Sequence, residues 1–109
     1  MVVIIFILLS STIRLRGQCD AQVSISASSA VICQGSSVTF LATPVNAGTS
    51  PLFQWKVNGV NAGINNSVFI TSTLFNNDLI SVDLTPDPVD CPASTTVTSN
   101  VITMTVNTE

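Results

Sequence analysis

The sequence predicts an all-β fold, an antiparallel two-sheet sandwich of about seven strands. Short runs of alternating apolar and polar residues recur along the chain, turn-forming residues separate these runs, and no stretch has a convincing helical period. Ser, Thr and Asn fill most polar positions, as strands with solvated outer faces and turns require, and only 8% of the residues are charged. With 109 residues, 46% of them hydrophobic, the chain has room for one globular domain.

The N-terminus is predicted to be a signal peptide over residues 1–21, which leaves residues 22–109 as the sandwich domain. Residues 2–9 form an unbroken apolar run, which is far shorter than the ~20 residues of a membrane span and is typical of the apolar region of a signal peptide. Small residues end at Ala21 and indicate cleavage after it. We therefore expect a secreted or cell-surface protein with no membrane span in the mature chain.

Two features of this N-terminus leave alternatives open. Arg14 and Arg16 follow the apolar run, whereas a signal peptide carries its positive charges before it. A lipid anchor on Cys19 is the less favoured reading, because Arg16 and the residues after it lack the small, apolar lead-in of such a site.

The three cysteines predict one disulfide bond. Removal of Cys19 with the signal peptide would leave Cys33 and Cys91, which an oxidising compartment would join. On the chain-entropy model, a bridge across this loop stabilises the fold by about 4 kcal/mol. The alternative is that Cys33 and Cys91 are two unrelated buried thiols.

The first two strands are predicted over residues 23–27 and 38–43. In each run apolar side chains alternate with Ser or Thr, and Phe40 falls on the inward face of the second strand. Pro44 has no N–H to donate, so we expect the second strand to end before it. A loop over residues 46–51 follows.

The third strand, residues 53–57, is predicted to be the centre of the fold. Phe53, Trp55 and Val57 alternate with polar residues, and the only Trp of the chain lies in the middle. We therefore assign Trp55, with Phe53 and Phe40, as the core anchor between the two sheets. Asn58-Gly59 follows directly and predicts a two-residue type I′ turn that begins a hairpin.

Three further strands are predicted over residues 68–71, 80–84 and 97–106. Ile80, Val82 and Leu84 point inward from one of them, and Met104 shares an inward face with its neighbours Ile102 and Val106 in the last. The loop between these two strands is stiffened by Pro86, Pro88 and Pro92.

Composition argues against several classes of function. The chain has no His, its cysteines are expected to pair, and no Ser lies in a Gly-x-Ser-x-Gly pattern, so we expect no catalytic residue and no enzyme activity. Three basic residues and a net charge of −3 make nucleic acid an improbable partner. No cofactor is expected, and Lys56 is expected to be a solvated side chain on the outward face.

The proline-rich loop is either a metal site or an ordinary loop. Asp87 and Asp90 share the proline-rich loop, with Asp83 nearby, and Ca²⁺ prefers carboxylates and loop carbonyls. The spacing matches no Ca²⁺-binding loop, however, and Asp is common in turns. We therefore predict no metal. Asn65 fits the glycosylation pattern, but one match carries no information in a chain so rich in Asn, Ser and Thr.

Four sequence segments together resemble a known family: residues 31–40, with Cys33-Gln34-Gly35; residues 53–59; residues 74–83 with the later Cys91; and residues 98–106. They look like the immunoglobulin-like or PKD-like repeats of large secreted bacterial surface proteins, of the adhesin and gliding-motility-associated type. The resemblance covers almost all of residues 22–109. It implies an immunoglobulin-like sandwich, often in tandem arrays, that is not catalytic and serves adhesion, spacing or display of neighbouring domains.

The resemblance therefore implies a structural or adhesion module whose partners are neighbouring domains or a cell-surface protein or glycan. The chain has no Tyr and thus lacks the tyrosine corner of antibody-type domains. The alternative function is that of a carbohydrate-binding module of a secreted enzyme, because sugars stack on exposed aromatic rings. With the core anchors excluded, Phe69 and Phe75 are the candidate exposed rings.

Overall fold

The computed structural model describes residues 19–92 and 95–108, so the predicted signal peptide lies outside the described residues up to residue 18. The described residues contain strands, turns and loops but no helix, and hence no helix long and apolar enough to cross a membrane. In chain order the strands are β1 (Gln22–Ala27), β2 (Val31–Cys33), β3 (Val38–Val45), β4 (Leu52–Val57), β5 (Val60–Ala62), β6 (Val68–Thr71), β7 (Leu79–Thr85), β8 (Val97–Thr98), β9 (Ile102–Thr103) and β10 (Thr105–Asn107). The predicted all-β class is confirmed.

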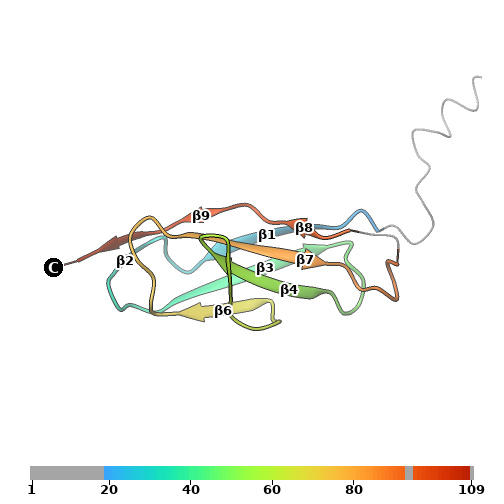
Figure 1. Cartoon of the computed structure of the whole chain (residues 1–109), viewed down its shortest axis with the longest axis horizontal. Helices are drawn as coiled ribbons and strands as arrows, with labels where there is room; N and C mark the ends of the chain where they lie inside the picture. The colour runs from blue at the N-terminus through green and yellow to red at the C-terminus, as the bar shows by residue number, and fades with distance from the viewer. Residues whose placement is uncertain (1–18, 93–94, 109) are drawn as a thin grey trace, which may run out of the picture.

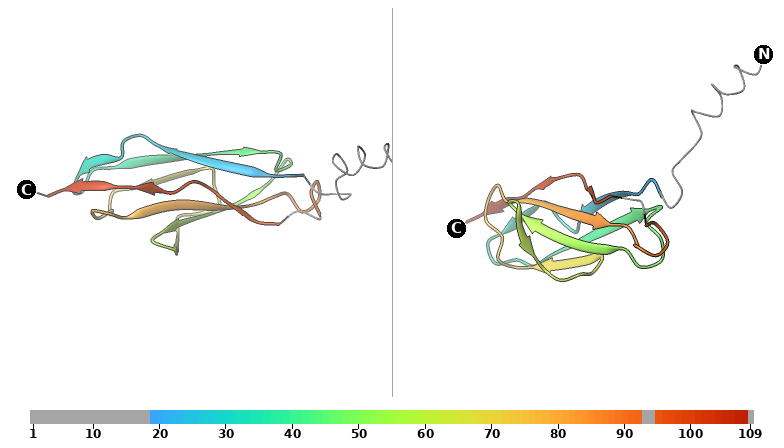
Figure 2. Two further views of the ribbon diagram at one scale, coloured as in Figure 1. Left: turned by 90° about the horizontal axis from the view of Figure 1, so that it is seen from above. Right: turned by 45° about the vertical axis from the view of Figure 1, so that its right-hand side comes forward.

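The strands form two antiparallel sheets that lie in separate layers (Figures 1 and 2). Sheet I has the order β1-β3-β6, and sheet II has the order β5-β4-β7-β8, with β9 also pairing with β7. The short strands β2 and β10 form a separate parallel pair. This arrangement is consistent with the predicted β-sandwich, but ten short strand segments take the place of about seven longer strands.

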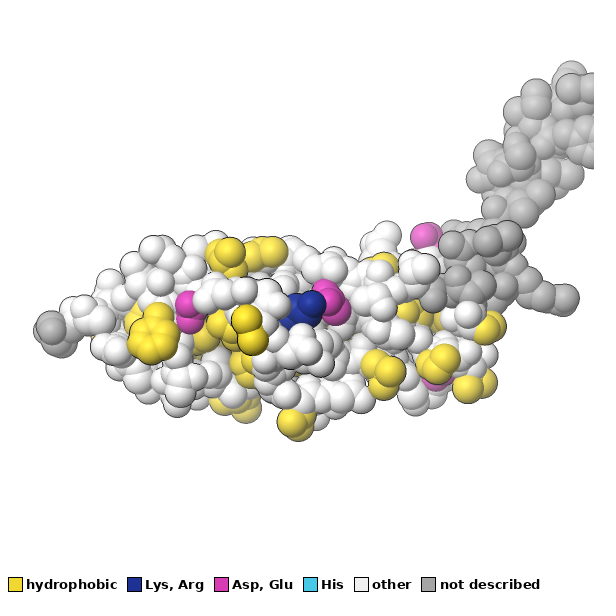
Figure 3. All heavy atoms as spheres, viewed as in Figure 1, with side chains coloured by type: hydrophobic (Ala, Val, Ile, Leu, Met, Phe, Trp, Pro, Cys, Tyr) yellow, Lys and Arg dark blue, Asp and Glu magenta, His cyan; other side chains and the backbone are white. Residues whose placement is uncertain are grey.

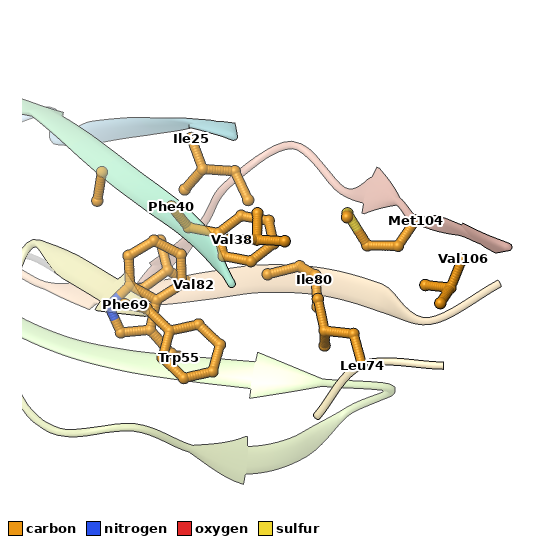
Figure 4. Close-up of a cluster of buried hydrophobic side chains, with 11 residues drawn as sticks. Ile25, Val38, Phe40, Trp55, Phe69, Leu74, Ile80, Val82, Met104 and Val106 are labelled. Atoms are coloured by element: carbon orange, nitrogen blue, oxygen red, sulfur yellow. The ribbon is translucent and has the colours of Figure 1, made fainter. Parts of the chain in front are cut away.

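Three aromatic rings join the two sheets at the centre of the core (Figure 4). Trp55 of sheet II stacks on Phe69 of sheet I with ring centroids 5.5 Å apart, and it lies 6.3 Å from Phe40. Trp55 and Phe40 are completely buried, whereas Phe53 is only partly buried at the margin of the core. The indole N–H of Trp55 donates to the backbone carbonyl of Asn66 at 2.7 Å, which satisfies its one polar atom.

The remaining core side chains come from the alternating positions of the strands. Such alternation places every second residue on the inner face of its sheet. The buried cluster consists of Ile25, Val38, Phe40, Ala42, Trp55, Phe69, Leu74, Ile80, Val82, Met104 and Val106. Every inward-facing residue predicted for the strand over residues 80–84 is buried, as is Met104 in the last strand.

Strand β3 continues through Pro44, contrary to the expectation that Pro44 would end it. Pro44 pairs with Val23 of β1 in the ladder of sheet I. The N–H of Ala42 points toward β6, and the backbone direction alternates along a strand, so the nitrogen of Pro44 also faces that side. Strand β6 does not reach this far, and no donor is needed at Pro44.

The predicted last strand over residues 97–106 is interrupted and appears as β8, β9 and β10. Asn100 lies at the first interruption, between β8 and β9. Its side-chain oxygen accepts the N–H of Ile25 at 2.8 Å, and its side-chain nitrogen donates to the carbonyl of the same residue at 3.2 Å. The carboxamide thus replaces a backbone pairing and joins sheet II to β1 of sheet I.

Strand β6 forms one edge of sheet I among the described residues. Ala42 donates to the carbonyl of Ser67, and the alternation of hydrogen-bonding direction then turns the N–H groups of Val68 and Ile70 toward the open side. The side-chain oxygen of Asn66 accepts the N–H of Val68 at 2.9 Å. The side chain of Asn66 therefore pairs with one of the two outward N–H groups of this edge, and the N–H of Ile70 is left open to solvent.

Candidate functional site

The two ends of the described chain lie at opposite poles of the elongated molecule (Figures 1 and 2). The N-terminal pole is formed by Cys19, the loop over residues 46–51 and the loop over residues 86–92. The C-terminal pole is formed by the turn between β4 and β5, the loop that precedes β7, and the parallel pair of β2 and β10. Each pole contains polar side chains that connect its loops.

At the N-terminal pole, the carboxylate of Asp87 is enclosed by backbone donors. It accepts the N–H groups of Ser50 and Val89 at 2.8 Å each, and that of Asp90 at 3.3 Å. The hydrogen bonds from Val89 and Ser50 stabilise the charged carboxylate and hold the pKa of Asp87 below its ordinary value of 3.8. Asp87 therefore connects the two loops of this pole through hydrogen bonds.

Asp90 makes a second connection between the same loops. One of its carboxylate oxygens accepts both the backbone N–H and the hydroxyl of Thr49, each at 2.7 Å. Gly48 lies directly beneath with a φ angle of +83°, and a Cβ atom there would stand 2.7 Å from the Cβ of Asp87 and 2.9 Å from the Cβ of Asp90. Only glycine fits this position, because any other residue would combine a strained backbone with a steric clash.

The three aspartates weighed as metal ligands do not converge on one site. Asp83 lies on β7 and forms an ion pair with Lys56 of β4, with 3.0 Å between the side-chain nitrogen and oxygen. Figure 3 shows few charged side chains on the face that it draws. Asp87 and Asp90 direct their oxygens at N–H and O–H donors, as a carboxylate in a structural turn does. Among residues 19–92 and 95–108, no three His, Cys, Asp or Glu side chains gather closely enough to hold a metal ion.

The disulfide bond joins Cys19 to Cys91, with a Cα–Cα distance of 5.5 Å, and the predicted pairing of Cys33 with Cys91 is wrong. Cys33 is a free, exposed thiol. Cleavage after Ala21, the predicted end of the signal peptide, would break the backbone between Cys19 and the first strand, although Cys19 is bonded to Cys91. Cys19 thus belongs to the folded domain, while the signal peptide itself stays a prediction.

Strand direction explains why Cys33 cannot reach Cys91. Strand β3 is antiparallel to β1, and β7 is antiparallel to β9. Both β3 and β7 therefore run from the C-terminal pole to the N-terminal pole (Figure 1). Cys33 precedes β3 and therefore lies at the C-terminal pole, where the N–H of the next residue, Gln34, bonds to the carbonyl of Asn107. Cys91 follows β7 and lies at the N-terminal pole. A disulfide needs Cα atoms within about 7 Å.

At the C-terminal pole, the Asn58-Gly59 turn is fixed to the start of β7. Both residues have positive φ angles, +54° and +80°, so the predicted type I′ geometry is confirmed. The side chain of Asn58 donates to Asp78 at 2.8 Å and accepts the N–H of Leu79 at 2.9 Å. The other carboxylate oxygen of Asp78 accepts the N–H of Phe75 at 2.8 Å. Sequence analysis missed this cluster, although three closely spaced polar turn residues were its signal.

Between the edges β5 and β6 lies an apolar hollow of about 420 Å³. It is lined by Val57 and Val60 from one sheet and by Phe69 and Leu74 from the other side. Phe69 forms its inner wall and is itself buried, packed so closely that a Cβ on Gly63 would stand 2.8 Å from its ring. The hollow exists because no further strand covers this side of the two sheets among the described residues.

The two rings considered for sugar binding differ in their exposure to solvent. Phe69 belongs to the core stack and is only 8% exposed. Phe75 is 64% exposed at the C-terminal pole, where its N–H donates to Asp78. The glycosylation candidate Asn65 is also used by the fold, because its side-chain oxygen accepts the N–H of Phe53 at 2.8 Å.

Comparison with known proteins adds no relative: no family model, no curated protein and no solved structure matches this chain.

Proposed function

We propose that this chain is a non-catalytic extracellular module of a bacterial cell-surface or secreted protein, of the immunoglobulin-like or PKD-like type, with a structural or adhesive role. The observation that carries the proposal is the position of the two ends of the described chain at opposite poles of an elongated molecule (Figure 1). A domain with this polarity lengthens a chain by its own long axis when it stands between two neighbours, which is what a spacer requires.

The chemistry of the side chains supports a structural role. The carboxylates of Asp78, Asp87 and Asp90 all accept hydrogen bonds that hold loops in place. Within the described residues, every buried side-chain nitrogen or oxygen has a hydrogen-bond partner. Polar groups that serve a reaction are instead poised toward a cleft with part of their hydrogen-bonding capacity open.

The disulfide supports an extracellular location. Structural disulfides form and persist in oxidising compartments, and the bond between Cys19 and Cys91 encloses most of the domain's sequence. The surface is also suited to a secreted domain, because Ser, Thr and Asn rather than Lys and Glu provide most of its polar groups.

The exposed thiol of Cys33 offers a direct test of location. A bacterium that produces the full chain is treated, as intact cells, with a maleimide that does not cross membranes. We expect the wild-type chain to be labelled and a Cys33→Ser variant not to be labelled, since the other two cysteines are bonded. Labelling that occurs only after lysis would place the chain inside the cell and overturn the proposal.

A carbohydrate-binding module is the second candidate, and the exposed ring of Phe75 is the observation that favours it. Phe75→Ala should then abolish retention on the polysaccharides that the wild type binds. Ile64→Ala is the matched control, because Ile64 is 73% exposed but lies in the loop between β5 and β6. If the wild type is retained on none of a panel of plant, algal and bacterial polysaccharides, the candidate is removed.

A further inference from the structure

The disulfide connects two positions that are distant in sequence but adjacent at one pole. Cys19 precedes the first strand by only a few residues, and Cys91 follows β7, so the sequence separation of the two cysteines is 72. All strands from β1 to β7 lie inside this covalent loop, and only β8, β9 and β10 lie beyond it. Any pull on the chain before Cys19 therefore reaches Cys91 through two sulfur atoms, without passing along the backbone between them.

We propose that the Cys19–Cys91 disulfide is a tension bypass, which carries force from the N-terminal side of the domain directly into its last strand segment and shields residues 20–90 from extension. The inference rests on the proposed function as a spacer for its biological setting, but the mechanical property follows from the connectivity alone. The disulfide therefore sets an upper limit to the length that the domain can reach under load.

The segment that would carry the force runs from Cys91 at the N-terminal pole to β10 at the C-terminal pole (Figure 2). Strands β8 and β9 pair with β7, and β10 pairs in parallel with β2. Hydrogen bonds between strands lie across the strand direction, so a pull between the poles shears these ladders instead of opening them one bond at a time. Because the segment already runs from pole to pole, its release adds little length.

The same segment is anchored from both sides near its end. Met104 exchanges backbone hydrogen bonds with the loop before β7, since its N–H donates to Asp78 and its carbonyl accepts from Asn77. The next residue, Thr105, donates to Ala30 beside β2. Met104 is also completely buried in the core, which adds apolar contacts to the hydrogen bonds. The loaded segment is therefore held by both hydrogen bonds and apolar contacts near its end.

The remainder of the core lies within the covalent loop. Nine of the buried cluster's members, including Trp55, Phe40 and Phe69, lie between the two cysteines, and Met104 and Val106 lie outside. If the last segment is pulled away, the strands from β1 to β7 stay joined at their ends by the disulfide, and recovery requires only that one segment docks again.

Single-molecule force spectroscopy tests the proposal. The full chain in a Cys33→Ser background, which removes the spare thiol, is placed between two handle domains of known unfolding length. A fully extended residue spans at most about 3.3–3.6 Å, so the sequence separation of 72 between the cysteines corresponds to about 240–260 Å of hidden length. We expect oxidised molecules to unfold without this length and molecules held in reductant to show it.

Two variants complete the design. Cys19→Ser/Cys91→Ser, in the same background, should release the hidden length with or without reductant. If this variant fails to fold, reduction of the folded oxidised chain while it is held at low force supplies the same comparison. Equal unfolding lengths before and after reduction would overturn the proposal. Failure of maleimide labelling on intact cells would instead refute the extracellular role and leave the unfolding lengths unchanged.

Discussion

The side chain of Asn58 donates to the carboxylate of Asp78 at 2.8 Å and joins the tip of one hairpin to the strand that follows in the same sheet. Its oxygen also accepts the N–H of Leu79, and its backbone N–H donates to the carbonyl of that residue. One asparagine thus supplies both the positive φ angle of the turn and the bonds that hold the turn in place.

Asn58→Ala is expected to destabilise the fold by about 2–3 kcal/mol, because it loses the side-chain bonds and places alanine at a positive φ angle. Asn58→Gly keeps the backbone conformation and loses only the bonds, so its cost should be smaller by about 1 kcal/mol. Urea unfolding followed by circular dichroism measures both. Equal costs for the two variants would show that the φ angle contributes nothing.

Trp55→Ala is expected to cost about 3–5 kcal/mol and can prevent folding, as removal of a large core side chain does. Trp55→Phe retains much of the volume but leaves the carbonyl of Asn66 without its indole donor, so we expect an intermediate loss. Ile70→Ala, at a position that is 62% exposed, is the control and should change stability little. A Trp55→Ala variant as stable as this control would contradict the assignment of Trp55 as the core anchor.

Gly48→Ala and Gly35→Ala form a matched pair at the same kind of backbone position. Their φ angles are +83° and +89°, but a Cβ on Gly48 meets Asp87 and Asp90 within 3 Å, whereas a Cβ on Gly35 meets no atom within 4 Å. Gly35→Ala should cost about 1 kcal/mol from conformation alone. Gly48→Ala should cost at least twice as much, and similar midpoints in thermal unfolding would refute the crowding of this pole.

Cys19→Ser should lower the free energy of unfolding by about 4 kcal/mol, since the disulfide closes a long loop in the unfolded chain. Cys33→Ser should leave stability and the disulfide intact, because Cys33 is exposed and free. Proteolytic peptides separated without reductant identify the partners directly. Recovery of a peptide that links Cys33 to Cys91 from the folded protein would contradict the structure.

Stability should fall in acid through Asp87. Its pKa is lowered in the folded state, so its contribution is complete above the unfolded-state value near 3.8 and is lost as pH falls through the folded value. Asp87→Asn should therefore be less stable than the wild type at pH 7 and lose less stability between about pH 4 and pH 2. Val89→Ala in the same loop, 84% exposed, should keep the wild-type pH dependence in urea titrations.

Local features of the fold could be predicted from the sequence, because strands and turns depend on neighbouring residues. The strand predicted over residues 68–71 coincides with β6, and Asn58-Gly59 forms the expected turn. Pro44 misled the prediction because its effect depends on whether a neighbouring strand faces its nitrogen, which only the sheet order reveals.

The disulfide could not be assigned by counting cysteines, because the count assumed that Cys19 leaves the domain. The direction of the strands decides the pairing, and the sheet order is needed to see it. Strands β3 and β7 belong to different sheets but run in the same direction, so the start of β3 and the end of β7 lie at opposite poles. This excludes a bond between Cys33 and Cys91 and leaves Cys19 as the partner.

The edge strand β6 bears on how this protein behaves at high concentration. Exposed edges usually resist pairing with another chain through charged side chains, but β6 carries none, and Asn66 instead occupies the first open N–H. Salt screens charges and leaves such a hydrogen bond unaffected. The tendency of the chains to associate should therefore vary little with ionic strength and rise when the Asn66 side chain is removed.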